Sequence, residues 1–188
     1  NKTALFKADA NPQIVSSDKV LGTTTPVSGQ YGISTNPESF ANYGRNSYFT
    51  DATRGVVLQL AGGLSVISEA GMKDYFSDTL KDITLYTILG TFDEKKGEYN
   101  LTIEDRYFTI DGVNIPTIYP RGDSYYTTIS YSEIAKGWSS FKTFSPEQGL
   151  SINNDYYTWK NGSMWQHHSN TASNTFYGSH ATADRSSI

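Results

Sequence analysis

A short strand–turn–strand pattern recurs in this chain and constrains its fold more than any other sequence feature. Each copy joins two aromatic or β-branched strands through a few polar residues and a glycine. The four copies occupy residues 48–57, 91–99, 129–138 and 157–165. Their turn glycines are Gly55, Gly97, Gly137 and Gly162, at steps of 42, 40 and then 25 residues. A period of about 40 residues built from aromatic hairpins is typical of β-propeller blades or a related β-array.

The composition supports a mainly β chain. Of 188 residues, 14 are Tyr, 9 are Phe and 16 are Gly. Aromatic side chains pack well on half-buried pleated surfaces, and glycine supplies turns. We therefore predict repeated antiparallel hairpins, either propeller-like or in an open β-array. Residues 1–44 are predicted to form a loop-rich β segment, followed by a hairpin-repeat β domain over 45–188.

One short helix is predicted near residues 68–81. Ser68 is a suitable N-cap, and Ile67 and Met72 can form a hydrophobic staple. The apolar residues that follow fall on one helical face. These residues are Met72, Tyr75, Phe76 and Leu80. The pattern predicts a connector packed on a sheet.

Charge and composition argue against several classes of partner. The net charge is −4, whereas nucleic-acid-binding domains are usually basic. The sequence contains no run of about 18 apolar residues, which is the length that a membrane-spanning helix needs. With no cysteine, thiolate metal sites are excluded. The sequence begins at Asn1 without a leader-like segment, and we expect it to be a piece of a longer polypeptide.

The repeated turns contain residue types whose conformational preferences suit a turn. An Asp or Ser after the first strand can accept a hydrogen bond from the backbone two residues on, and the glycine supplies a positive φ. The turns also hold most of the acidic residues that a glycosidase would need as a pair. These acids are Asp51, Asp93, Glu94, Glu98 and Asp105. We predict turn-forming or exposed roles for them and no catalytic site.

His167 and His168 are the only adjacent histidines. Neighbouring side chains on a strand point to opposite faces, so the two cannot easily bind one metal ion. No sequence motif for a nucleophilic serine or a phosphate-binding loop is present. We therefore expect no metal site and no cofactor.

The aromatic residues leave two interpretations open. They could form a subunit interface or a platform that stacks on glycans, since large amphipathic rings suit both. The candidates are Trp138, Trp159, Trp165, Tyr156 and Tyr157. Packing between strands is the alternative, and it is favoured for Trp138 and Trp165, which closely follow turn glycines.

Several segments carry a resemblance to a known group of proteins. They are 31–40 (YGISTNPESF), 48–51 (YFTD) with Arg54-Gly55, 67–76 (ISEAGMKDYF), 97–102 (GEYNLT), 136–142 (KGWSSFK) and 153–168. Together they resemble virion structural proteins of tailed bacteriophages, over roughly residues 18–178. The resemblance implies a tail component similar to the nozzle or tail-tube proteins of short-tailed phages, which carry propeller-like β domains.

The expected function is therefore a non-enzymatic structural role in a phage virion. We expect assembly with other virion proteins in a homo-oligomeric ring, located in the tail, without membrane or direct nucleic-acid contact. A module that binds host surface glycans is the alternative. A polysaccharide hydrolase is a third possibility with little support in the sequence.

Overall fold

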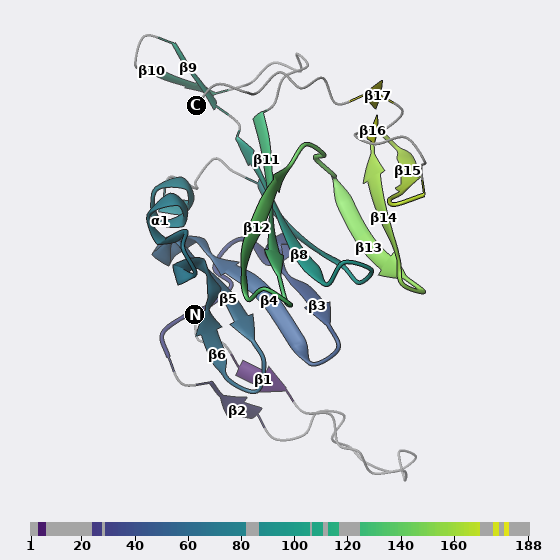
Figure 1. Ribbon diagram of the computed structural model, residues 1–188. Coiled ribbons are helices and arrows are strands. Elements are labelled where there is room, and N and C mark those ends of the chain that lie inside the picture. Colours follow the sequence, from purple (N-terminus) through teal and green to yellow (C-terminus); the bar gives the residue numbers. More distant parts are fainter. Residues whose placement is uncertain are drawn as a thin grey trace, which may run out of the picture.

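The structure, a computed structural model, describes three main stretches of the chain together with several short strands. The main stretches are residues 29–81, 87–105 and 125–169, and the shorter ones are 4–6, 24–27, 107–110, 113–116, 175–176 and 179–180. These residues are mainly β, with one α-helix and no sheet closed into a barrel (Figure 1). The prediction of repeated hairpins in an open β-array is confirmed.

Three larger antiparallel sheets form the body of the fold. The first, the β3–β6 sheet, contains β3 (Ala41–Tyr43), β4 (Asn46–Asp51), β5 (Val56–Leu60) and β6 (Leu64–Val66). The central sheet contains β7 (Thr87–Asp93), β8 (Glu98–Asp105), β11 (Tyr125–Ser132) and β12 (Gly137–Lys142). The β13–β15 sheet contains β13 (Gln148–Ile152), β14 (Asp155–Lys160) and β15 (Ser163–Gln166).

The smaller elements are two-stranded ladders and single helical turns. The ladders join β1 (Ala4–Phe6) to β2 (Thr24–Pro26), β9 (Tyr107–Ile110) to β10 (Val113–Pro116), and β16 (Thr175–Phe176) to β17 (Ser179–His180). The 3-10 turns are η1 (Pro37–Ser39), η2 (Ala52–Arg54) and η3 (Ile67–Glu69). The η1 turn follows Asn36 and begins at Pro37, whose restricted φ suits the first position of a helical turn.

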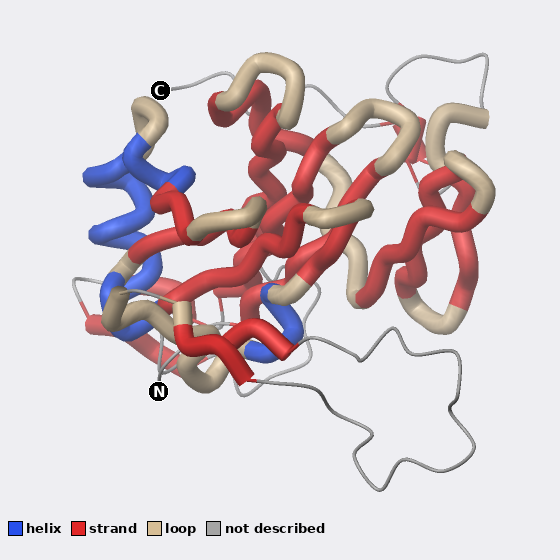
Figure 2. Tube along the Cα trace, turned by 90° about the horizontal axis from the view of Figure 1, so that it is seen from below, coloured by secondary structure: helices blue, strands red, loops and turns tan. Residues whose placement is uncertain are grey.

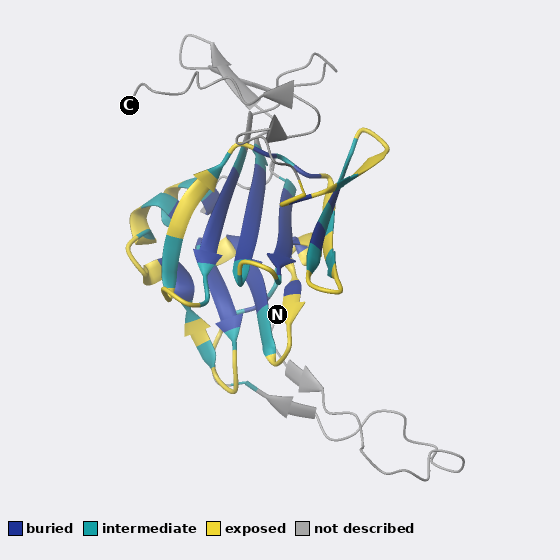
Figure 3. Ribbon diagram, turned by 45° about the vertical axis from the view of Figure 1, so that its right-hand side comes forward, coloured by how far each residue is buried: buried dark blue, intermediate teal, exposed yellow. Residues whose placement is uncertain are grey.

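The central sheet lies between the other two. Its β7 strand contacts β3 and β4 of the first sheet and also β13 and β14 of the third. The helix and the β13–β15 sheet lie on opposite sides of the molecule (Figure 2). The most buried strands are those where the first and central sheets meet (Figure 3).

An apolar core fills the space between the first and central sheets. Tyr48 of β4 stacks on Tyr99 of β8 with ring centroids 4.8 Å apart, and on Phe92 of β7 at 5.5 Å. Val57 and Leu101 are fully buried in the same cluster. Burying rings of this size supplies much of the apolar stabilisation in a small β fold.

The helix α1 spans Lys73–Lys81 and covers one end of this core. Phe76 and Leu80 are buried, with Met72 and Tyr75 packed beside them, so the predicted apolar face is confirmed. Its predicted start at Ser68 is wrong: Ser68 lies within η3, and Gly71 at φ 82° separates that turn from the helix. A residue in the left-handed region ends a helical turn, so α1 begins anew at Lys73.

Three turns share one hydrogen-bond pattern. Asp51 accepts a bond from the backbone N–H of Arg54 (3.2 Å), Asp93 from that of Lys96 (3.2 Å), and Ser132 Oγ from that of Ala135 (3.2 Å). The predicted Asp or Ser role is therefore confirmed, but the bond reaches three residues on, where two had been expected.

In each of these three turns, the residue after the N–H donor has a positive φ, in the left-handed region. Gly55 (φ 65°) and Gly97 (φ 64°) occupy it in the first two, but Lys136 (φ 52°) does so in the third. Gly137 instead begins β12, so its expected positive φ is wrong. The fourth turn is of another kind, a two-residue connection in which Asn161 and Gly162 both have positive φ, as tight hairpins require.

The sequence period does not map onto one sheet per copy. The second and third copies form the β7–β8 and β11–β12 hairpins of the same central sheet. The first and fourth lie in the first and third sheets. The recurring unit is therefore the hairpin and its turn.

Candidate interaction surface

The five aromatic candidates are not gathered in one place. Tyr156 is fully buried against the central sheet, where its hydroxyl lies 2.8 Å from Thr91 Oγ1. Trp138 is half-buried and donates its Nε1–H to the carbonyl of Ile67 at 3.0 Å, with its ring 4.5 Å from that of Phe76. Tyr156 is therefore inaccessible to a glycan, and Trp138 connects the central sheet to the helical region.

The other three candidates divide between the two faces of the β13–β15 sheet. Trp165 pairs with Thr158, which is buried on the side facing the central sheet. Tyr157 and Trp159 alternate with the buried Tyr156 and Thr158 along β14, so they lie on the opposite side. The structure thus places two of the five candidates together on one open face.

We call this side the outer face of the β13–β15 sheet. Strand register places three rows of side chains across it: Leu150, Tyr157 and Gln166; Gln148, Trp159 and Met164; and Ile152 with Asp155. Leu150 is 53% exposed, Ile152 49% and Met164 61%. The aliphatic residues of this face gave no distinct sequence signal, although the alternation along β13 could have indicated them.

Charge is confined to one corner of the outer face. Asp155 forms an ion pair with Lys95 of the β7–β8 turn, with 3.6 Å between Oδ1 and Nζ. The two rows beside it consist of aliphatic, aromatic and amide side chains. Fully buried parts of protein interfaces are likewise poor in charge and rich in aromatic residues and Met.

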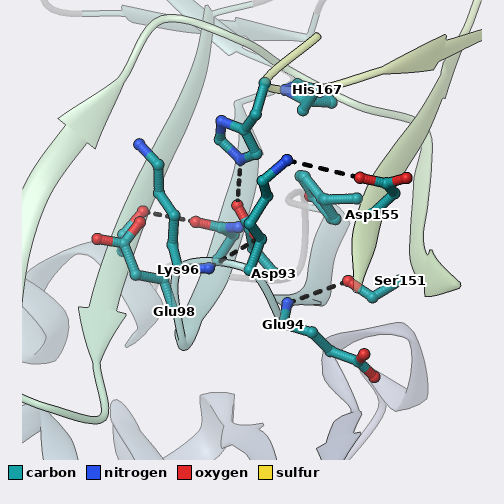
Figure 4. A network of polar contacts seen from close by, with 12 residues as sticks. Asp93, Glu94, Lys96, Glu98, Ser151, Asp155 and His167 are labelled. Carbon is teal, nitrogen blue, oxygen red and sulfur yellow. Dashed lines mark hydrogen bonds and ion pairs between the residues drawn. The ribbon is translucent and has the colours of Figure 1, made fainter. Parts of the chain in front are cut away.

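The inner side of the same sheet is fastened to the central sheet by polar contacts (Figure 4). Ser151 Oγ donates to the carbonyl of Phe92 at 2.8 Å and accepts from the N–H of Glu94 at 3.1 Å. It thereby satisfies backbone groups at the free edge of β7, in place of a neighbouring strand. His168 Nε2 lies 2.7 Å from Asp93 Oδ2 nearby.

His167 is enclosed at this junction. Its ring lies 4.8 Å from those of Phe144 and Tyr156, and its Nε2 is 2.7 Å from Thr158 Oγ1. Burial, and secondarily the neighbouring His168, lowers the pKa of His167 from 6.5 to about 4. The ring is therefore neutral at pH 7.

The junction between the first and central sheets contains a buried polar group of its own. The Tyr48 hydroxyl donates to Glu133 Oε1, and Gln59 Nε2 donates to the same oxygen. Burial, reinforced by the hydrogen bond to Glu133, raises the pKa of Tyr48 above its ordinary value. Lys136 pairs with the other oxygen of Glu133 at 2.6 Å. This cluster links the β11–β12 turn to strands β4 and β5.

Three of the five carboxylates considered for catalysis have structural partners: Asp51, Asp93 and Glu98. Asp51 accepts bonds from the N–H of Gly32 and from Arg54 Nη1, both at 3.0 Å. Glu98 pairs with Lys142 at 2.9 Å across the central sheet, and Asp93 contacts His168. The Asp105 side chain lies outside the described residues. Among those the structure describes, no three acidic or histidine side chains are grouped to hold a metal ion.

Comparisons with known proteins yield no relative from which a function could be read. No model of a protein family matches the chain, and no match is found among curated proteins. Among the described helices, none has the length and apolar character needed to cross a membrane.

Proposed function

We propose that this chain is a non-enzymatic structural component of a bacteriophage virion, associated with the tail, that acts through subunit interfaces in a homo-oligomeric ring. The phage assignment rests on the resemblance of segments such as 67–76 and 97–102 to virion structural proteins of tailed bacteriophages, which implies a tail component. The structural role is supported mainly by the outer face of the β13–β15 sheet, where exposed aliphatic side chains lie beside aromatic and amide ones, as in protein interfaces.

The polar residues support a scaffold in a second way. Asp51, Asp93, Glu98 and Glu133 each bond to groups that hold turns or sheets together. A catalytic acid pair would need two carboxylates converging on an open cleft. The observed partners instead lie in turns, within the central sheet or between neighbouring sheets.

Location in the particle can be tested directly. Antibodies raised against the chain should label the tail of phage particles that encode it, as seen by immunoelectron microscopy. Peptides of the chain should also be present in purified particles by mass spectrometry. Labelling of the capsid, or absence from the particle, would contradict the proposal.

Assembly can be tested on the isolated chain. Light scattering and negative-stain electron microscopy should show ring-like oligomers, and substrates such as polysaccharides should remain intact. Hydrolysis that is abolished by a single change such as Asp93→Asn would favour an enzyme instead.

One observation favours a glycan-binding module as the second candidate. Tyr157 and Trp159 share the outer face, with the amide side chains of Gln148 and Gln166 in the same rows. Aromatic rings beside amides can stack on sugar rings and bond their hydroxyls. Binding to a panel of host glycans that is lost in Trp159→Ala, while the fold is retained, would support this candidate.

A further inference from the structure

The two faces of the central sheet differ in chemistry. The central sheet turns an apolar face, with Phe92 and Tyr99, toward the first sheet. Its other face carries buried hydroxyl groups, and Thr91 and Thr128 bond across to Tyr156 and to the carbonyl of Phe144. On the inner side of the third sheet, the fully buried Tyr156 meets this face with its hydroxyl group.

The outer face of the β13–β15 sheet is the next surface beyond this contact, and five of the eight side chains in its rows are aromatic or aliphatic. Its character matches the interior between the first and central sheets, where aromatic and aliphatic residues from two sheets pack together. Three of the seven large apolar side chains exposed among the described residues lie here: Leu150, Ile152 and Met164. Such gathering on one face marks an interaction site, whereas single exposed apolar residues are ordinary.

We propose that the outer face of the β13–β15 sheet docks onto the same face of a second copy of this chain. The inference rests on the proposed structural function and names one of its contact surfaces. Under a two-fold axis every contact occurs twice, so the aliphatic, aromatic and amide side chains of the Leu150 and Trp159 rows in one copy would meet the same set of side chains in the other.

Charge is what favours a second copy as the occupant. A face that pairs with itself brings together the same set of side chains from both copies, so any net charge on the face would repel. The Leu150 and Trp159 rows carry no formal charge, and the corner residue Asp155 is already neutralised by Lys95. Two aligned sheets of this kind pack about 10 Å apart with interdigitated side chains.

The area of the outer face limits the expected affinity between the two copies. Three strands about 4.8 Å apart and five residues long at about 3.4 Å each cover an area of roughly 15 by 17 Å. A stable interface buries about 800 Å² on each partner, so this contact is small and belongs to the weak class. We expect dissociation constants in the micromolar range or weaker and an equilibrium that depends on concentration.

Sedimentation velocity over a wide concentration range tests the proposal on the whole chain. The wild type should shift from monomer to dimer as its concentration rises. Leu150→Lys and Met164→Lys each place a charge against its symmetry mate, and each should weaken dimerisation at least tenfold. Both side chains are half exposed or more, so the fold should survive, and circular dichroism would verify this.

Ile134→Lys is the matched control. Ile134 is 87% exposed but lies in the β11–β12 turn of the central sheet, away from the outer face. The same substitution there should leave dimerisation unchanged. A wild type that stays monomeric at high concentration, or variants that dimerise as well as the control, would overturn the proposal.

Other results separate this inference from the proposed function. A two-fold contact closes after two copies, so a ring would need a different surface. Dimers that are lost in Leu150→Lys while no rings form would support the contact and contradict the ring. Rings that form while neither lysine variant weakens dimerisation would do the reverse. Monomeric protein that binds a neutral oligosaccharide through Trp159 would overturn the contact in favour of a glycan platform.

Discussion

Gly90 lies where three elements meet closely. A Cβ built on it would overlap the carbonyl oxygen of Ser39 and lie 2.6 Å from the carbonyl carbon and 2.9 Å from the Tyr99 hydroxyl. That hydroxyl donates to the same Ser39 carbonyl at 2.8 Å, and Ser39 Oγ accepts the N–H of Thr50 at 3.0 Å. The η1 turn therefore packs directly on β7 because position 90 has no side chain.

We expect Gly90→Ala to lower the free energy of unfolding by about 3 kcal/mol, since backbone has to move to admit the methyl group. Urea denaturation followed by fluorescence would measure the loss. Gly63→Ala serves as the control, because a Cβ there has no atom within 4 Å, and its effect should stay below about 0.5 kcal/mol. Equal effects at the two positions would show that the close approach does not hold the turn in place.

His167 makes stability depend on pH. In the unfolded chain its imidazole takes up a proton near pH 6.5, whereas in the folded chain burial holds its pKa at about 4. Between these values the unfolded state binds more protons, so the free energy of unfolding falls as the pH falls from 6.5 to 4. The contribution should be fully present above pH 6.5 and amount to at most about 3 kcal/mol.

The prediction concerns a difference between two proteins. His167→Gln keeps a polar group near Thr158 but cannot titrate, so its urea stability should lose less than that of the wild type between pH 7 and pH 4.5. His168→Gln, which breaks the contact with Asp93, should keep the slope due to the buried ring. Parallel pH profiles for His167→Gln and the wild type would rule out a depressed pKa.

At the scale of elements, Ser151 controls how the third sheet attaches. Its hydroxyl contacts two backbone groups of β7 and its turn, at Phe92 and Glu94. Ser151→Ala leaves both groups without this partner, and an unsatisfied buried polar group costs about 1–3 kcal/mol. The β13–β15 sheet should then open locally more often.

Hydrogen exchange measured by mass spectrometry would detect this opening. Amides of β13 and β14 should exchange about tenfold faster in Ser151→Ala, while those of β4 and β5 should be unchanged. Ser163→Ala, on the exposed β15 strand, is the comparison and should have little effect. Uniform acceleration over the whole chain would mean that Ser151 affects global stability and not the attachment alone.

The sequence predicts the helices and hairpins better than it predicts which of their side chains are buried and which are exposed. A hairpin over residues 48–60 is predictable because Asp51 can accept a backbone hydrogen bond and Gly55 can adopt a positive φ. The helix α1 is indicated by the spacing of Phe76 and Leu80. The predicted start of α1 was wrong because Ser68 is a residue type that commonly caps helices. In the structure, the positive φ of Gly71 separates the η3 turn from the helix.

The candidate surface was only partly predictable, and for a different reason. Tyr156 and Tyr157 are the same residue type, side by side, yet one is buried and the other lies on the outer face. Alternation along a strand tells which residues share a face, but tertiary packing decides which face is covered. Leu150 and Ile152 were overlooked because apolar residues on a strand are ordinarily assigned to a core.

At the scale of the whole molecule, the character of the outer face predicts a salt response. Raising sodium chloride from about 0.1 M to about 1 M shortens the screening length from about 10 Å to about 3 Å and weakens ionic contacts. Dimerisation through the uncharged rows should not weaken over this range. Sedimentation at both salt concentrations would test it, and a strong loss of dimer in high salt would point to a charged contact elsewhere.

The order of strands in the sheets also bears on how the chain acquires its fold. Each larger sheet is built from strands that follow one another in the chain, apart from the β9–β10 hairpin between β8 and β11. Contacts between sequence neighbours form quickly, and a growing chain folds from its N-terminal side. The β3–β6 sheet can therefore be complete while later strands are still being synthesised. We expect the β13–β15 sheet to dock last, because its strands are synthesised after those of the central sheet on which it packs.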